Sequence, residues 1–276
     1  MPAEPKVALH YTHGNLMETI RTALAALGKS VGTATVDDLA PVDEFHVGGR
    51  KATEEFLCQL GFTPEKHVLE IGSGLGGSAR FIASRYGSRV TGVDVTAEFV
   101  ETAIALSKSV ALDNLISFHL GSALDMPFPD ASFDGAYMMH VGMNIEDKEK
   151  LAAEVARVLR PGAVFGIYDI MRTAPGDLAY PVPWAAAPDL SAVAEPQRYR
   201  GALEAAGFRV TAERNRRDFA LTFFEELRAK NAAAGGPPPL GLHLLMGRNT
   251  PDKVANTIAN VSKGLIAPIE MIAHKI

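Results

Sequence analysis

From residue 66 onward, two kinds of hydrophobic pattern alternate along the chain. Short apolar runs, typical of buried strands, are separated by longer segments in which apolar residues recur at helical spacing. The predicted strands are residues 67–71, 89–95, 115–120, 133–140, 163–170, 208–214 and 266–273. Because single helices separate successive strands over most of this region, the pattern predicts an α/β fold with a mostly parallel sheet and helices on both faces.

A helical pattern also precedes the first strand. Asn15 is expected to cap a helix whose apolar residues fall on one face and which ends at Gly28. The polar stretch 32–41 is expected to form a loop, and a second helix is expected to end near Leu60. We interpret residues 1–60 as an N-terminal helical lid that precedes the main domain.

The main domain, residues 61–276, departs from simple alternation in two places. Residues 171–194 are rich in proline, contain the only tryptophan, Trp184, and are expected to form a long loop after the fifth strand. Residues 219–264 hold two amphipathic helical patterns joined by a hinge of small residues and prolines. We interpret both segments as caps over the edge of the sheet where the parallel strands end.

Composition narrows the class of protein. The 276 residues are 47% hydrophobic and 21% charged, as in a soluble globular protein, and the net charge of −5 argues against general attraction to nucleic acid. One cysteine, Cys58, excludes an intrachain disulfide and is expected in the core. Histidines and carboxylates do not occur at metal-ligand spacing, so no metal is expected. Neither a signal peptide nor a bilayer-spanning run is predicted, so we expect a cytoplasmic enzyme without membrane partners.

The first strand runs directly into a glycine-rich turn that is followed by a helical pattern. Gly72, Gly74 and Gly77 satisfy the dinucleotide-binding pattern G-x-G-x-x-G. Glu70 begins a second match, acid-x-G-x-G-x-G, which ends at Gly76. Such a turn lets a ligand approach bare backbone beside the free N–H groups of a helix start. The turn therefore predicts a nucleotide-like cofactor without deciding which one.

Asp94 stands at the end of the second predicted strand, 22 residues after Gly72. A carboxylate at this spacing can accept hydrogen bonds from both ribose hydroxyls of a bound nucleoside. It would serve a nicotinamide dinucleotide and S-adenosylmethionine equally well, so it does not separate the two cofactors.

Two later segments do separate them. Residues 121–134, Gly-Ser-Ala-Leu-Asp-Met-Pro-Phe-Pro-Asp-Ala-Ser-Phe-Asp, resemble the segment between the third and fourth strands of class I S-adenosylmethionine-dependent methyltransferases. Residues 159–163, Leu-Arg-Pro-Gly-Ala, resemble the turn before the fifth strand of that family. With the acid-and-glycine turn and Asp94, four motifs occur in family order within residues 60–170. The chain resembles the small-molecule branch, which includes sarcosine/dimethylglycine, phosphoethanolamine and natural-product methyltransferases.

This resemblance implies a Rossmann-like sheet of seven strands, S-adenosylmethionine as cofactor, and methyl transfer to a nitrogen, oxygen or carbon atom of a small molecule. It assigns cofactor contacts to Glu70, Gly72, Ser73, Gly74, Asp94, Val95, Ser122, Ala123 and Leu124. His46 is a further candidate for a cofactor contact, from its place before the second predicted helix. The family often has aspartate where this chain has Ser122, and that carboxylate accepts from the adenine amino group. A serine hydroxyl is a weaker acceptor, and backbone contacts from Ala123 could do part of the work.

Residues outside these motifs are candidates for the acceptor side of the site. His140, at the end of the fourth predicted strand, is the candidate general base, with a structural or cofactor-positioning role as the alternative. Tyr11 is expected to fold over the site from the N-terminus, and His46 to reach the methionine carboxylate or the substrate. The predicted substrate pocket is completed by Met143, Asp169, Trp184 and His243.

Two other functions stay open on the sequence. An NAD(P)-dependent oxidoreductase would use the dinucleotide pattern alone. A non-catalytic cofactor-binding protein would fit the departure at Ser122.

Overall fold

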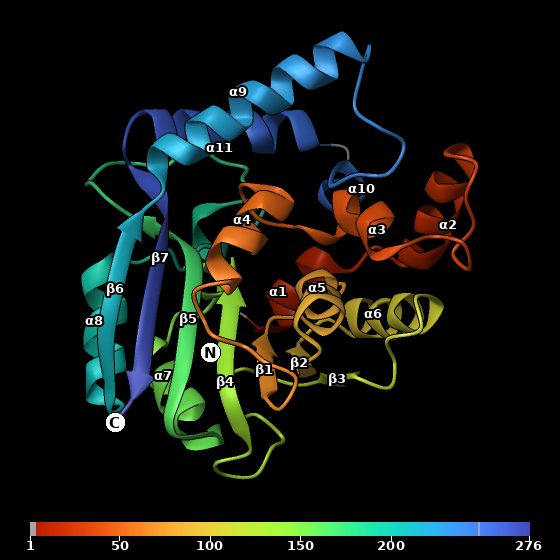
Figure 1. Ribbon diagram of the computed structural model, residues 1–276. Helices are drawn as coiled ribbons and strands as arrows, with labels where there is room; N and C mark the ends of the chain where they lie inside the picture. The colour runs from red at the N-terminus through yellow and green to blue at the C-terminus, as the bar shows by residue number, and fades with distance from the viewer. Residues whose placement is uncertain (1–3, 248) are drawn as a thin grey trace.

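The computed structural model describes residues 4–247 and 249–276 and is built around one sheet of seven strands (Figure 1). In chain order the strands are β1 (His67–Ile71), β2 (Arg89–Asp94), β3 (Ile116–Leu120), β4 (Phe133–Met139), β5 (Leu159–Arg172), β6 (Phe208–Asn215) and β7 (Ile266–Lys275). Their order across the sheet is β3-β2-β1-β4-β5-β7-β6, and β7 runs antiparallel to both β5 and β6. The prediction of a mostly parallel, Rossmann-like sheet is confirmed.

The direction of strand order reverses between β1 and β4. β1 leads outward to β2 and β3, whereas β4 continues the sheet on the other side and pairs in parallel with β1, Val68 opposite Gly135 and Ile71 opposite Met138. Ligands of open α/β sheets bind beyond the carboxyl ends of the strands at such a reversal. The topology therefore directs attention to the loops after β1 and β4, which hold the glycine turn and His140.

Helices cover both faces of the sheet. One face carries α4 (Gly49–Leu57), α5 (Gly77–Tyr86) and α6 (Ala97–Ser109), and the other carries α7 (Lys148–Val158) and α8 (Pro196–Ala205). Phe56 and Ile82 belong to the same buried apolar cluster as Val68 of β1. On the opposite face, Val155 is buried in one cluster with Phe165 of β5. Each helix thus buries one apolar stripe on the sheet, which is why its sequence shows helical periodicity.

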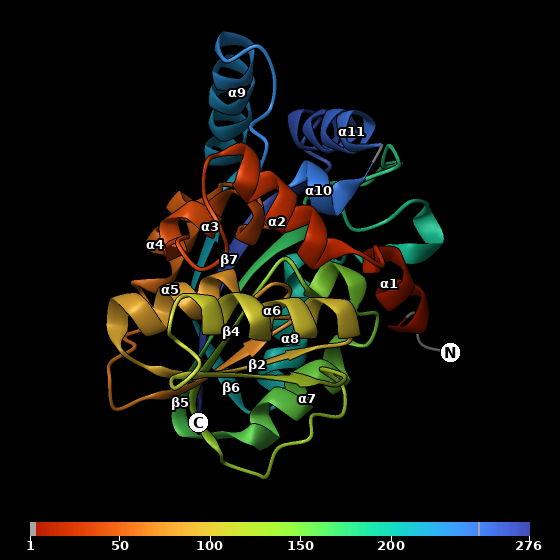
Figure 2. The same cartoon turned by 90° about the vertical axis from the view of Figure 1, so that its right-hand side faces the viewer.

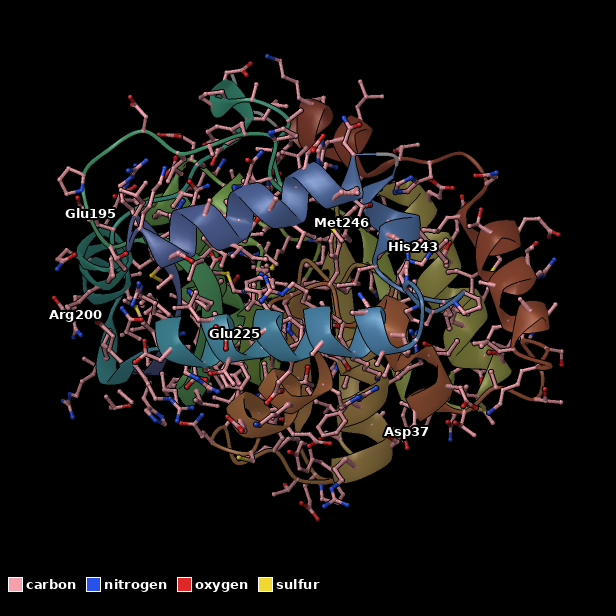
Figure 3. The ribbon with its side chains drawn as sticks, turned by 90° about the horizontal axis from the view of Figure 1, so that it is seen from above. Asp37, Glu195, Arg200, Glu225, His243 and Met246 are labelled. Carbon is pink, nitrogen blue, oxygen red and sulfur yellow. The ribbon has the colours of Figure 1, made fainter. Side chains whose placement is uncertain are left out.

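The remaining helices gather at the edge where the parallel strands end. They are α1 (Glu4–Tyr11), α2 (Leu16–Ala26), α3 (Val36–Asp43), η1 (Gly142–Asn144), η2 (Pro188–Leu190), α9 (Arg217–Ala233), α10 (His243–Met246) and α11 (Thr250–Ser262). Figure 2 shows α1 and α2 on the α6 side of this edge, and Figure 3 shows α9, which carries Glu225, crossing above the molecule. Among the described residues, none of the helices is both long and apolar enough to cross a membrane.

The expectation of a loop over residues 32–41 is wrong, because α3 begins at Val36. Its first turn is closed by a capping box: Thr35 Oγ1 accepts from the N–H of Asp38 at 3.2 Å, and the Asp38 carboxylate accepts from the N–H of Thr35 at 2.9 Å. Leu39 and Val42 are buried in an apolar cluster at this edge of the sheet. The capping box and this burial stabilise a helix where the polar composition indicated none.

Two predicted boundaries near the site also differ from the structure. β4 ends at Met139, so His140 lies in the turn after the strand and not within it. α7 ends at Val158 and β5 starts at Leu159, so the segment 160–162, expected to end the helix, belongs to the strand.

Candidate functional site

The glycine turn joins β1 to α5. Gly72, Gly74 and Gly76 have φ angles of 66°, 51° and 75°, left-handed values that favour glycine. A Cβ added to Gly72 would lie 2.4 Å from the Val141 side chain, which shows how closely the turn packs on the loop after β4. A Cβ added to Gly74 would meet no atom of residues 4–247 or 249–276 within 4 Å. The backbone at Gly74 therefore borders open space, as a turn that receives a ligand requires.

Asp94 ends β2 beside this turn. Its carboxylate accepts hydrogen bonds from the backbone N–H groups of Gly74 and Thr96, each at 2.8 Å. Burial raises the pKa of Asp94, and these hydrogen bonds to its ionised form oppose the rise. The structure thus brings Asp94, followed directly by Val95, to the open part of the turn.

Glu70 lies on β1 under the first turn of α5. Ser78 Oγ donates a hydrogen bond to one carboxylate oxygen, whereas the other, Oε2, is buried without a hydrogen-bond partner in the described part of the chain. Burial raises the pKa of Glu70 to about 8, and the Ser78 bond opposes that rise. The Ser73 hydroxyl is likewise buried, and no described residue is its hydrogen-bond partner. Buried polar atoms without partners are uncommon, so these two are candidates for a ligand contact.

Ser122 follows β3 at the same edge of the sheet. Its Oγ accepts from the N–H of Leu124 at 2.9 Å and donates to the carboxylate of Glu4 on α1. Ala123, between Ser122 and Leu124, is buried in the apolar core. No local sequence pattern marks Glu4 as a site residue, because only the fold brings it to Ser122, across 118 residues.

His140 directly follows β4 with a φ of 56°, and its N–H donates to the carbonyl oxygen of Tyr168 at 2.7 Å. Its ring centroid lies 5.2 Å from that of Tyr168 and 5.9 Å from that of His46. The ring atom Nε2 is buried and has no hydrogen-bond partner among the residues that the structure describes. Burial, with a smaller effect of His46, holds the pKa of His140 well below 6.5. A neutral imidazole with a free nitrogen is able to accept a proton.

His46 is held in place by side chains around the start of α4. Its Nε2 lies 2.9 Å from Glu44 Oε2 and 3.0 Å from Thr53 Oγ1. Arg50 Nε pairs with the other oxygen of Glu44 at 3.0 Å. His46 is only 8% exposed, so the ring is fixed with one edge toward His140. Glu44 was not among the predicted site residues; its place two residues before His46 is the one sequence signal for it.

Tyr11 extends from α1 over the edge of the sheet. Its hydroxyl donates to Asn144 Oδ1 in η1 at 3.1 Å. Burial, then the nearby charges of Asp94 and Asp169, raise the pKa of Tyr11 above its ordinary value. The structure therefore brings Tyr11 close to Asp94, and the phenol stays protonated at neutral pH.

The chain between α1 and α2 is anchored to α6. The Glu98 carboxylate accepts hydrogen bonds from the backbone N–H groups of His13, Gly14 and Leu16, at 2.5, 2.9 and 2.8 Å. Asn15 is the residue before α2, but its side chain makes no capping bond, so the predicted cap is supplied by Glu98 instead. This anchor holds α1 in its place beside the site.

Met143 and Trp184 share an apolar cluster above the sheet. Met143 is 4% exposed, and Trp184 is 3% exposed with its indole N–H donating to Ser191 Oγ at 3.0 Å. The cluster also contains Val47, Ile170, Val182, Ala185, Ala220, Val261 and Ile266. It therefore joins the segment before α4, η1, the loop after β5 and the helices α9 and α11.

Asp169, predicted to face the edge of the substrate pocket, is enclosed by protein groups. Its side chain is fully buried, Oδ2 accepts from the Tyr199 hydroxyl at 2.7 Å, and Oδ1 accepts from the N–H of Ile170 at 2.9 Å. Burial raises its pKa to about 6, opposed by Tyr199 and by the charge of Lys148. A Cβ added to Gly142 would lie 2.4 Å from Asp169 Oδ2, so the Asp169 carboxylate packs directly against the first residue of η1.

His243 lies apart from the other predicted site residues. It begins α10, as the view from above in Figure 3 shows. Within the described residues, no hydrogen bond or ring contact joins His243 to His140, His46 or Tyr11. The structure does not bring it into the group formed by the other candidates.

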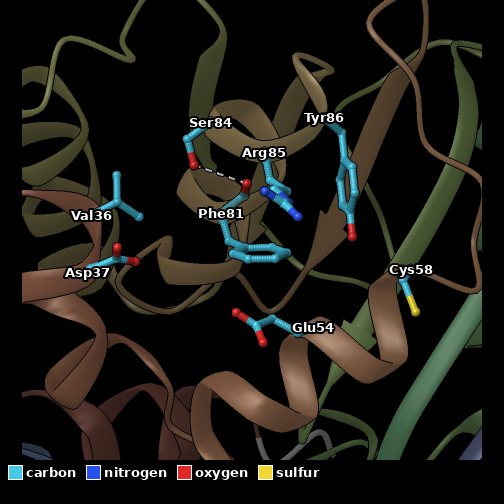
Figure 4. A pocket seen from close by; sticks show the side chains of 8 residues that line it. All are labelled: Val36, Asp37, Glu54, Cys58, Phe81, Ser84, Arg85 and Tyr86. Carbon is cyan, nitrogen blue, oxygen red and sulfur yellow. Dashed lines mark hydrogen bonds between the residues drawn. The ribbon is translucent and has the colours of Figure 1, made fainter.

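A surface groove of about 460 Å³ lies elsewhere, between α3, α4 and the last turns of α5 (Figure 4). It is lined by Val36, Asp37, Glu54, Cys58, Phe81, Ser84, Arg85 and Tyr86. The prediction that Cys58 is a core residue is wrong, since it is exposed just after α4, whose Phe56 and Leu57 take the buried positions. The glycine turn is at the other end of α5, so this groove is not part of the site.

Within residues 4–247 and 249–276, no group of three His, Cys, Asp or Glu side chains is placed so that it could hold a metal ion. The candidate site consists of the glycine turn, the acids at the ends of β1 and β2, the loops after β3 and β4, and the helix α1.

Comparison with known proteins agrees with this arrangement. Residues 69–167 match the family described as Methyltransferase domain. The chain is 34% identical over 134 residues to O-methyltransferase resE of Aspergillus sclerotiorum, covering 49% of this chain and 51% of that protein. It is 35% identical over 134 residues to ajmaline N-methyltransferase of Rauvolfia serpentina, covering 45% and 46%. The chain thus spans about half the length of these curated relatives.

The fold is similar to that of solved structures over a longer range. Geranyl diphosphate C-methyltransferase from Streptomyces coelicolor A3(2), solved with Mg²⁺, geranyl-S-thiolodiphosphate and S-adenosyl-L-homocysteine, aligns with a TM-score of 0.73. The alignment covers 100% of this chain and 99% of that one at 17% identity. At this identity the likeness concerns the fold alone.

Proposed function

We propose that the protein transfers a methyl group from S-adenosylmethionine to a nitrogen, oxygen or carbon atom of a small molecule, because residues 69–167 match the family described as Methyltransferase domain and the sheet is Rossmann-like. One observation carries the proposal: the backbone at Gly74 is open and is bonded to the Asp94 carboxylate where the strand order reverses. The two alternatives, an NAD(P)-dependent oxidoreductase and a non-catalytic binding protein, gain no support from the relatives, which are methyltransferases.

The residues at the turn fit this cofactor. Gly72 and Gly74 allow the backbone to approach it, and a Cβ at Gly74 would fill the space that a ligand needs. Asp94, next to Val95, would accept charge-assisted hydrogen bonds from the two ribose hydroxyls through lone pairs that its bond from the Gly74 N–H leaves available. Ser122, Ala123 and Leu124 lie at the end of β3, where they would line the adenine.

The polar atoms without partners fit the methionine end. Glu70 Oε2 and Ser73 Oγ are buried and unsatisfied, so an α-ammonium group would supply the missing donor. Such a cation would also favour the ionised form of Glu70, whose pKa burial raises to about 8. His46, with its Nε2 engaged by Glu44, would reach the same region through the rest of its ring.

Little chemistry is asked of the protein itself. The cofactor supplies a methyl group already activated on a sulfonium. The chain must hold the acceptor atom in line with the S–CH₃ bond at roughly 3–3.5 Å and exclude water. For an O–H or N–H acceptor, His140 would take the proton at Nε2, which has no hydrogen-bond partner among the described residues and belongs to a ring whose pKa burial holds well below 6.5. A carbon acceptor would use the same positioning, with the proton leaving after the new bond forms.

Residues 1–60 would act as the lid over this site, and segments 171–194 and 219–264 as caps on the domain 61–276. Tyr11 reaches across to Asn144 from the lid side, while Met143 and Trp184 join the caps in one apolar cluster. These contacts support a pocket that closes over an acceptor with an apolar body. In this proposal, His243 and Asp169 support the surrounding structure and do not contact the acceptor.

The acceptor class and location follow the same reasoning. A net charge of −5 supports a small-molecule acceptor and not a nucleic acid. We place the activity in the cytoplasm, because S-adenosylmethionine is available there and because a reducing compartment suits a chain with a single cysteine.

Calorimetry of the full chain with S-adenosylmethionine and S-adenosylhomocysteine tests the cofactor. We expect saturable binding at a single site, and no binding at millimolar cofactor would contradict the proposal. Incubation with methyl-labelled cofactor and a fractionated cell extract tests the transfer. Label in a small-molecule product is the expected result, whereas cofactor binding without transfer to any fraction would favour the non-catalytic alternative.

A further inference from the structure

The contact between Ser122 and Glu4 has a consequence for cofactor recognition. The Ser122 hydroxyl accepts from the N–H of Leu124 and donates its single proton to the Glu4 carboxylate. A hydroxyl has one proton and two lone pairs, so this hydroxyl is largely engaged within the protein. What lies at the end of β3 is therefore a carboxylate, supplied by α1 and held in place by the serine.

The position of Glu4 is defined by the rest of α1. Glu4, Val7 and Tyr11 are spaced three and four residues apart, so their side chains lie on one face of the helix. Val7 is the buried residue of this face, and the Tyr11 hydroxyl bonds to Asn144 after β4. At the far end of the helix, His10 Nε2 lies 2.9 Å from the carbonyl oxygen of Pro183. The face that carries Glu4 is thus laid across the ends of β3 and β4.

We propose that Glu4 reads the exocyclic amino group of the cofactor's adenine. This rests on the function proposed above and adds to it a residue outside the methyltransferase domain. Aspartate is frequent at position 122 in the family that the chain resembles, and here the carboxylate reaches the same place from the N-terminal helix. One oxygen of Glu4 holds Ser122, and within the described residues no hydrogen bond engages the other. That oxygen is available to accept from the amino group.

A carboxylate is suited to this task because it accepts hydrogen bonds and cannot donate them when ionised. The adenine 6-amino group donates, whereas the 6-oxo group of hypoxanthine only accepts and would face the negative charge. A site built around a hydrogen bond rejects an analogue that cannot make it more strongly than a site built on shape alone. Glu4 therefore gives selectivity for adenine, and that selectivity depends on α1 lying closed over the site.

The test compares two ligands that differ at this one group, S-adenosylhomocysteine and S-inosylhomocysteine, by calorimetry on the full chain. Wild-type protein should prefer the adenosyl compound. Glu4→Ala should lower the affinity for it about tenfold, as expected for one charge-assisted hydrogen bond, and should raise the affinity for the inosyl compound, because its oxo group no longer faces the carboxylate charge. Glu18→Ala, the same change at an exposed acid on α2, is the matched control and should behave as wild type with both ligands.

A second variant separates recognition from closure of the lid. In the double variant Glu4→Ala/Ser122→Asp the carboxylate is moved to position 122, and the preference for the adenosyl compound should return. Equal weakening of both ligands by Glu4→Ala would overturn the proposal, since Glu4 would then act only in holding α1 down. Unchanged binding of both would overturn it too. Failure of wild-type protein to bind either compound would instead contradict the proposed function itself.

Discussion

The imidazole of His46 stands at 71° to that of His140, with the ring centroids 5.9 Å apart. His46 is fixed from behind by Glu44, whose carboxylate lies 2.9 Å from Nε2. Burial of the His140 ring lowers its pKa well below 6.5, and the electrostatic effect of the neighbouring His46 lowers it further. The pair thus keeps neutral the imidazole that follows β4, next to the glycine turn.

We expect His140→Gln to slow methyl transfer to an O–H or N–H acceptor by about 10²–10⁴-fold, because the side chain that takes the acceptor's proton is lost. Glutamine keeps a polar group of similar size, so binding of S-adenosylhomocysteine should change by less than about twofold. His274→Gln is the matched control, since His274 is exposed on β7 opposite Val164 of β5. Equal rates for wild type and His140→Gln with such an acceptor would show that His140 is not the base.

The pH profile of methyl transfer should reflect the low pKa of His140. An exposed histidine is half protonated near pH 6.5, but His140 stays neutral there, so the rate at saturating substrates should remain constant as the pH falls from about 8 to 6.5. An acidic limb should appear only at lower pH. His46→Gln removes the charge effect of His46, which lowers the pKa of His140, and should therefore move this limb to higher pH. A wild-type limb centred at or above pH 6.5 would contradict the assignment.

Asp94→Ala should weaken binding of S-adenosylhomocysteine by about 1.5–3 kcal/mol, because charge-assisted hydrogen bonds to the ribose are lost. Removal of the carboxylate also frees the Gly74 N–H that it accepts from, so the turn loses its internal anchor. Calorimetry measures the effect, with Asp113→Ala, at an exposed position after α6, as the control. An affinity equal to that of wild type would place the ribose elsewhere.

Local sequence patterns predicted much of the fold around the glycine turn. Apolar runs located the strands, and the left-handed φ values at Gly72 and Gly74 are why glycine recurs in the turn. Asp94 was predicted from its spacing after Gly72, because the carboxyl ends of parallel strands lie at the same edge of the sheet. The helix α3 was also encoded, by Thr35 and Asp38, but its polar composition hid the capping box.

The rest of the site depends on contacts that no local pattern contains. Glu4 meets Ser122 only because α1 is tied across the edge of the sheet. Asp169 belongs to β5, a strand buried on both faces, so the apolar run gave no alternation from which to tell pocket from core. Sequence periodicity determines which stripe of an element is buried; it does not determine which distant element covers it.

Glu70 should make the free energy of unfolding depend on pH in protein without cofactor. Burial raises its pKa from an ordinary value of 4.5 to about 8, so between these values the folded state keeps a proton that the unfolded chain has released. The stability linked to this group is fully present below pH 4.5 and is lost as the pH rises through 8, by at most about 1.4 kcal/mol per pH unit. Above that range both states are ionised and the loss levels off.

Glu70→Gln is neutral at every pH and has the shape of the protonated acid, so this variant should escape the loss. Urea unfolding near pH 5, 7 and 9 should show the variant gaining stability relative to wild type as the pH rises, with no further gain once the pH exceeds about 8. Glu101→Gln, on the exposed side of α6, makes the same chemical change and should show a constant difference. If the Glu70→Gln difference were also constant from pH 5 to 9, Glu70 would have to be ionised in the folded protein. Its contact with an incoming ammonium group would then start from a carboxylate that is already charged.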